Sequence, residues 1–122
     1  MSLPPPPPAH VARYCDILGY DLTVDFILHF GGAELYIPAN SKGRGELAKF
    51  LGVEMADALA AQAHRLPTRV PTAKPWLAEV FRFRGWSVPM IARKLHVSDV
   101  AVRRWFKAAE AERFRKAQPG LI

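Results

Sequence analysis

Apolar residues in the last third of the chain repeat with the spacing of helices on both sides of a short break. Ile91 and Leu95 are four residues apart, so they lie on one face of a helix. Val102 and Trp105 are three apart and share one face of a second helix. The pattern over residues 87–107 therefore predicts two short helices joined by a tight turn, a helix-turn-helix.

Polar residues mark where both of these helices begin. Ser87 precedes the first helix, with Pro89 in its first turn, and Ser98 precedes the second. A serine hydroxyl at such a position accepts a hydrogen bond from a free backbone N–H of the first turn. His96 occupies the turn, where a left-handed backbone is expected, and histidine tolerates that conformation better than a β-branched residue does.

A third helix is predicted just before this pair, over residues 74–84. Its apolar stripe consists of Trp76, Leu77, Val80 and Phe81. We expect this stripe to form the third wall of a three-helix core, with Trp105 buried against it.

The second helix of the pair has a polar face opposite its apolar one. This polar face consists of Ser98, Asp99, Val100, Arg103, Arg104 and Lys107. If the helix enters the major groove of DNA, the residues at its beginning lie nearest the bases, Arg103 has the reach to bind guanine, and Arg104 reaches a phosphate. Cations around the helix are expected to clamp phosphates: Arg93, Lys94, Arg113, Arg115 and Lys116. The leading hypothesis is sequence-specific binding of double-stranded DNA.

The charge of the chain is distributed unevenly. The net charge is +6, yet residues 1–73 contain six Lys/Arg and seven Asp/Glu, whereas residues 74–122 contain eleven and four. Phosphate binding depends on local charge, so this asymmetry favours a DNA-binding C-terminal half. A basic face that only interacts with solvent is the alternative.

The N-terminal half repeats itself at an interval of 33 residues. The shift places Ile17-Leu18-Gly19 on Phe50-Leu51-Gly52, and Ile37-Pro38 on Val70-Pro71. Each copy predicts a helix that ends at a glycine, a second helix that follows at once, and an extended segment that ends at proline. The four helices are expected at about residues 10–18, 22–30, 45–51 and 54–64, with Asp21 as the cap of the second.

Two short strands are expected at the ends of these copies. Gly31 and Gly32 break the second helix, and residues 33–37 alternate between apolar and polar. Pro38 then ends any strand pairing. In the second copy, residues 68–70 lack the double glycine and are expected to pair only briefly.

The segment Phe30-Gly31-Gly32-Ala33-Glu34-Leu35-Tyr36-Ile37-Pro38, followed by a helix-turn-helix, resembles the Mor family of phage middle-operon transcription activators. The resemblance covers about residues 14–122, including the basic tail. It implies an N-terminal helical region that forms a homodimer, a Gly-Gly-x-x-x-Tyr-Ile-Pro strand, and a helix-turn-helix that binds an interrupted inverted repeat near a promoter.

The resemblance assigns particular residues to the dimer strand: Gly31, Gly32, Leu35, Tyr36, Ile37 and Pro38. It also favours an activator over a repressor, and leaves open whether host RNA polymerase is contacted. The chain departs from the family in one respect. The family places this strand directly before the DNA-binding helices, whereas residues 68–70 hold that place here.

The expected fold is mainly α, in three parts. Residues 1–9 contain five consecutive prolines and are expected to be a disordered arm that has no packed structure. Residues 10–73 form the helical repeats with short strands and supply the dimer. Residues 74–122 form the helix-turn-helix domain with its basic tail.

Other functional classes have little support in the sequence. The four histidines lack the spacing of a metal site, and the single cysteine has no evident catalytic partner, so we expect no cofactor, no metal and no enzyme activity. No apolar run approaches the length of about 20 residues that a membrane span needs. We expect a cytoplasmic protein that associates with the nucleoid. The alternatives are a protein-interaction module that reuses the helix-turn-helix, a repressor, or the DNA-reading subunit of a recombination system.

Overall fold

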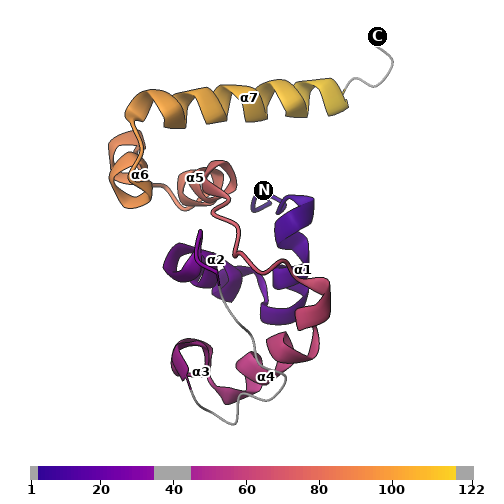
Figure 1. Ribbon diagram of the computed structural model, residues 1–122. Coiled ribbons are helices and arrows are strands. Elements are labelled where there is room, and N and C mark those ends of the chain that lie inside the picture. Colours follow the sequence, from indigo (N-terminus) through magenta and orange to yellow (C-terminus); the bar gives the residue numbers. More distant parts are fainter. Residues whose placement is uncertain (1–2, 35–44, 118–122) are drawn as a thin grey trace. The chain divides into compact units, whose positions relative to one another are not determined.

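The computed structural model describes residues 3–34 and 45–117, and this part of the chain is mainly helical, as expected (Figure 1). The helices are α1 (Ala9–Leu18), α2 (Tyr20–Phe30), α3 (Gly45–Leu51), α4 (Val53–Ala61), a 3₁₀ turn (Ala63–Arg65), α5 (Lys74–Phe83), α6 (Val88–Leu95) and α7 (Asp99–Ala117). The chain divides into two compact units. One is Pro7–Ala73, the helical-repeat unit, and the other is Lys74–Ile122 together with Met1–Pro6, the helix-turn-helix unit.

The 33-residue repeat of the sequence is a repeat of structure. Gly19 joins α1 to α2 with φ 86° and ψ 163°, and Gly52 joins α3 to α4 with φ 85° and ψ 158°. Each glycine amide donates to the carbonyl four residues earlier, on Cys15 or Ala48, at 2.8 Å. This backbone region is open almost only to glycine, so both copies need glycine at the joint.

The repeats pack on each other to form the core of this unit. Helix α1 packs on α2 and α4, and α3 packs on α2 and α4. The largest fully buried side chains are Val11, Tyr14, Val24, Phe26, Ile27 and Leu59. These helices are short, and burial against their neighbours stabilises them more than their intrinsic propensity does.

Two helix boundaries differ from the prediction. Helix α2 begins at Tyr20, because Gly19 takes the capping position, so Asp21 lies in the first turn and is not the cap. In this position the Asp21 carboxylate still interacts favourably with the positive end of the helix dipole. Helix α4 ends at Ala61, and a 3₁₀ turn follows where the pattern predicts α-helix up to residue 64.

The prediction of a strand at residues 68–70 is wrong. The described residues contain no strand, only an isolated antiparallel bridge between Glu34 and Arg69, whose side chains form an ion pair at 3.2 Å. Pro67 and Pro71 flank the segment and lack backbone N–H groups, which prevents a longer ladder. Of the expected strand at residues 33–37, only the first two residues are described.

The backbone around the strand motif requires glycine at both Gly31 and Gly32. A Cβ atom on Gly31 would lie 2.5 Å from the carbonyl oxygen of Ile27 and 3.2 Å from that of Pro71, so only glycine fits. Gly32 adopts φ 87°, and its amide donates to the carbonyl of Val70 at 2.8 Å. The other motif residues lie outside the described residues: Leu35, Tyr36, Ile37 and Pro38.

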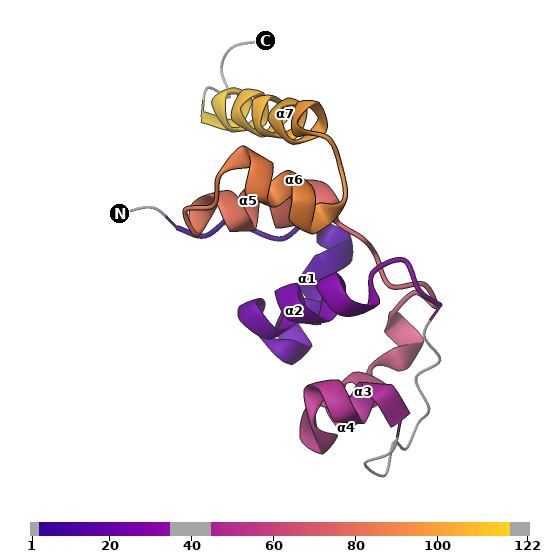
Figure 2. The ribbon, with the colours of Figure 1, turned by 90° about the vertical axis from the view of Figure 1, so that its left-hand side faces the viewer.

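Helices α5, α6 and α7 pack pairwise on one another in the helix-turn-helix unit (Figure 2). All four residues of the predicted α5 stripe are buried, with exposed fractions of 6% or less: Trp76, Leu77, Val80 and Phe81. Helix α7 continues for 19 residues, well beyond the three-helix core. Its first half is held by the core, and its second half carries most of the charged residues of the helix.

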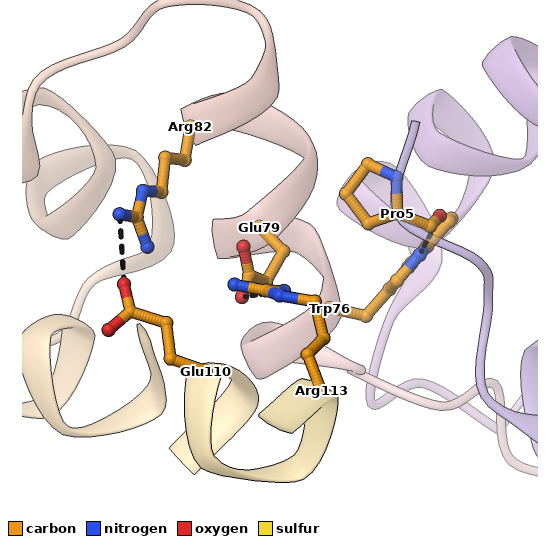
Figure 3. A network of polar contacts seen from close by, with 6 residues as sticks. All are labelled: Pro5, Trp76, Glu79, Arg82, Glu110 and Arg113. Atoms are coloured by element: carbon orange, nitrogen blue, oxygen red, sulfur yellow. Dashed lines mark hydrogen bonds and ion pairs between the residues drawn. The ribbon is translucent and has the colours of Figure 1, made fainter. Parts of the chain in front are cut away.

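The proline arm differs from the expectation of an unpacked segment. The indole N–H of Trp76 donates to the carbonyl oxygen of Pro5 at 3.1 Å (Figure 3). Pro8 then caps α1, since its carbonyl accepts from the amides of Val11 and Ala12. Pro5 and Pro8 of the arm therefore each accept hydrogen bonds from the unit to which they belong.

Candidate nucleic-acid interface

The turn between α6 and α7 has the geometry that the sequence predicts. The amide of Met90 donates to Ser87 Oγ at 3.4 Å, which confirms the first cap. His96 adopts the left-handed conformation, with φ 58° and ψ 48°. The amide of Ala101 donates to Ser98 Oγ at 3.1 Å, which confirms the second cap.

Backbone hydrogen bonds fix the end of α6. The amide of Val97 donates to the carbonyl of Ala92 at 3.0 Å, and the amide of His96 donates to that of Arg93 at 3.4 Å. This pair of bonds is the Schellman motif, which normally has glycine at the left-handed position. The direction in which α7 leaves the turn is therefore set by the backbone.

The inner face of α7 differs from the prediction at one residue. The pattern predicts Trp105 inside the core, but Trp105 is only half-buried, whereas Phe106 is 8% exposed. Phe106 lies four residues after the fully buried Val102, and the guanidinium of Arg82 stacks over its ring at 4.5 Å. A helical period of 3.6 residues leaves the third and fourth positions after Val102 nearly equivalent, and packing against α5 selects the fourth.

The polar face of α7 is accessible to solvent. Asp99 is half-buried, and the other five members of the face are exposed: Ser98, Val100, Arg103, Arg104 and Lys107. Asp99, Arg103 and Lys107 succeed one another at intervals of four residues, so they line one side of the helix. A carboxylate oxygen of Asp99 lies 3.9 Å from a guanidinium nitrogen of Arg103. Donors, an acceptor and an apolar contact are thus presented together on the first three turns.

The predicted phosphate-clamping cations fall into two groups. Arg93 and Lys94 are exposed in the last turn of α6, directly before the turn to α7. Arg113 and Arg115 instead form ion pairs within the protein, with Glu79 at 3.4 Å and Glu112 at 3.2 Å. Arg93 and Lys94 therefore fit the role of phosphate contacts better than the cations at the end of α7 do.

Two ion pairs fasten the second half of α7 to α5, and sequence reasoning missed both. Arg82 of α5 pairs with Glu110 at 3.1 Å, and Glu79 of α5 pairs with Arg113 at 3.4 Å (Figure 3). The charges are crossed, so each helix contributes one cation and one anion. The spacing of these charges could have indicated the pairs. Glu110 and Arg113 are three residues apart on α7, and Glu79 and Arg82 are three apart on α5, so each pair of charges lies on one face of its helix.

The described part of the chain contains one cysteine and several histidines and carboxylates outside the polar face of α7. No group of three or more His, Cys, Asp or Glu side chains is placed there to hold a metal ion. Burial raises the pKa of the Cys15 thiol, which disfavours the reactive thiolate at neutral pH. No described helix has both the length and the apolar character that a membrane span requires.

Comparison with known proteins gives no match: no protein-family model, curated protein or solved structure is similar to this chain.

Proposed function

We propose that this protein is a sequence-specific DNA-binding transcriptional regulator that reads base edges with the polar face of α7. The observation that carries the proposal is the division of α7 into two faces. Val102 and Phe106 are buried in the three-helix core, while Arg103, Arg104 and Lys107 are exposed on the other side. A helix that is anchored by one face and exposes donors on the other can enter a major groove without unfolding.

The charge of the same unit supports this proposal. Residues 74–122 contain eleven Lys/Arg and four Asp/Glu, and Arg93 and Lys94 lie next to the turn that positions α7. Phosphate contacts by such cations supply affinity and orientation, while the contacts of α7 to base edges supply specificity.

The proposal includes a homodimer that binds an inverted repeat. A two-fold symmetric dimer presents two copies of α7, and these fit half-sites separated by one DNA turn or a multiple of it. The resemblance to the Mor family supports this arrangement and favours activation over repression. A cytoplasmic location in association with DNA follows from the proposed role.

A salt titration of DNA binding tests the proposal. We expect the full-length protein to bind a duplex DNA pool, and the double variant Arg103→Ala/Lys107→Ala to bind at least tenfold more weakly. The matched control is Lys49→Ala/Arg65→Ala, which removes the same charge from the helical-repeat unit and should leave affinity within about twofold, since the proposal assigns the DNA contacts to the helix-turn-helix unit. Binding should fall steeply as salt rises.

The competing hypothesis is that the protein is a protein-interaction module, and it predicts a different result for the same titration. If α7 docks on a protein, duplex DNA binds weakly, and the two double variants reduce the affinity by the same small amount. That result would remove the DNA-binding proposal.

A further inference from the structure

The contact between the proline arm and the helix-turn-helix unit has the chemistry of a recognition site. Consecutive prolines form a polyproline II helix, which has no internal hydrogen bonds and leaves its carbonyl oxygens free to accept. The indole N–H of Trp76 donates to one of these carbonyls, that of Pro5, at 3.1 Å. The rest of the Trp76 ring is buried in the core and 6% of the residue is exposed, so the position of the donor is fixed.

The surroundings of this contact form a groove between α5 and α7. Glu79, Arg82 and Phe83 of α5 line it together with Arg113 of α7. The ion pairs Glu79–Arg113 and Arg82–Glu110 hold the two helices together along it (Figure 3). Glu79 is held firmly, since only 13% of its side chain is exposed. Both ion pairs therefore lie along the side of the groove that the helices form.

The arm does not fill this groove. An open pocket lies between the arm residues Leu3, Pro5 and Pro6 and the helix residues, and Phe83 remains 46% exposed beside it. An exposed aromatic ring next to a fixed donor is the combination that proline-reading domains present to extended proline-rich ligands. The groove thus offers more surface than its present occupant covers.

We propose that this groove is a polyproline-binding site, that residues 3–6 are its resident ligand, and that a proline-rich segment of another protein binds there by displacing the arm. The chemistry of the partner follows from the present occupant: an extended, proline-rich segment with a free carbonyl for Trp76 and a side chain or ring for Phe83. The resident arm belongs to the same chain, so it competes intramolecularly with any added proline-rich peptide and lowers the apparent affinity of that peptide.

The test uses the full-length chain and the indole N–H resonance of Trp76. The arm variant Pro4→Gly/Pro5→Gly/Pro6→Gly keeps the chain length and removes the polyproline conformation. We expect this substitution to shift the Trp76 resonance. A blocked Leu-Pro-Pro-Pro-Pro-Pro peptide should return it toward its original position, with an affinity at least tenfold higher than for the unaltered protein.

Two controls isolate the groove. A peptide of equal length in which glycine and serine replace the prolines should produce no shift. Adding Trp76→Phe to the arm variant should abolish peptide binding, as followed by the amides of the groove residues, and unchanged indole resonances of Trp86 and Trp105 would show that the unit is still folded.

Three results would overturn the proposal. The first is a Trp76 resonance that does not respond to the arm substitution. The second is an arm variant that does not bind the proline peptide at millimolar concentration. The third is equal affinity of the peptide for the arm variant and the unaltered protein, which would mean that the arm is not the competing ligand.

Discussion

At the residue scale, the ion pair between Asp99 and Arg103 decides whether Arg103 is free to bind a base. The side chain of Arg103 is 62% exposed and that of Asp99 is 44% exposed, and the two charges lie four residues apart on one helix. Such a pair contributes only about 0.3–0.5 kcal/mol. A bidentate contact between arginine and guanine contributes about 1–3 kcal/mol of discrimination. Under the proposed function the base contact would be the stronger of the two, so the pair with Asp99 would not prevent Arg103 from binding guanine.

Phe106 and Trp105 should differ in their effect on stability. We expect Phe106→Ala to lower the free energy of unfolding of the helix-turn-helix unit by about 3 kcal/mol, because it removes a buried ring from between α7 and α5. Trp105→Ala should cost clearly less, since Trp105 is only half-buried. Denaturant unfolding followed by circular dichroism measures both. A larger effect of Trp105→Ala would restore the arrangement that the sequence pattern predicts.

At the scale of elements, the two glycine joints make the repeat testable. A Cβ at Gly19 or Gly52 meets no atom within 4 Å, so an alanine there would be strained only by the positive φ. We expect Gly19→Ala and Gly52→Ala each to destabilise the helical-repeat unit by about 1–3 kcal/mol, and by similar amounts. Thermal unfolding measures the destabilisation, with the exposed Lys49→Ala as a control that should change stability by less than about 0.5 kcal/mol.

A marked difference between the two glycine variants would contradict the structural repeat. It would mean that one joint tolerates a different backbone, and that the shared sequence pattern does not impose a shared conformation.

Helices were predictable from the sequence where local chemistry and periodicity agree. Ser87, Ser98 and His96 each act on backbone groups within a few residues, so both ends of α6 and the beginning of α7 could be located from the sequence. The strand at residues 68–70 was mispredicted because pairing depends on a partner distant in sequence, and the flanking prolines allow only one bridge.

The candidate interface was predictable because helical periodicity decides which residues of α7 share a face. Periodicity alone could not decide contacts that depend on the shape of neighbouring helices. Val100, Arg104 and Lys107 are exposed because the helical period places them on the side of α7 away from Val102. The choice between Trp105 and Phe106 depends on the shape of α5. The contact of Trp76 with Pro5 was missed because the pattern assigns Trp76 to the core and says nothing of the direction of its N–H.

At the scale of the whole molecule, charge separates the two parts of the chain. Residues 74–122 have a net charge of +7 and residues 1–73 a net charge of −1, so under the proposed function the salt dependence of DNA binding should be a property of the helix-turn-helix unit. We expect Arg93→Ala/Lys94→Ala to weaken binding equally on all DNA sequences. The slope of log K against log salt should decrease by about one for each phosphate that the variant no longer neutralises. An effect confined to one DNA sequence would reassign these residues to base contacts.

Selection of bound fragments from a random DNA pool, at two salt concentrations and with Arg103→Ala in parallel, tests the central claim most directly. The unaltered protein should enrich an inverted repeat, and Arg103→Ala should abolish base preference at one symmetric pair of positions, at a cost of about 1–3 kcal/mol for each. Enrichment of no sequence, with binding that only weakens as salt rises, would contradict the claim that the polar face of α7 reads bases.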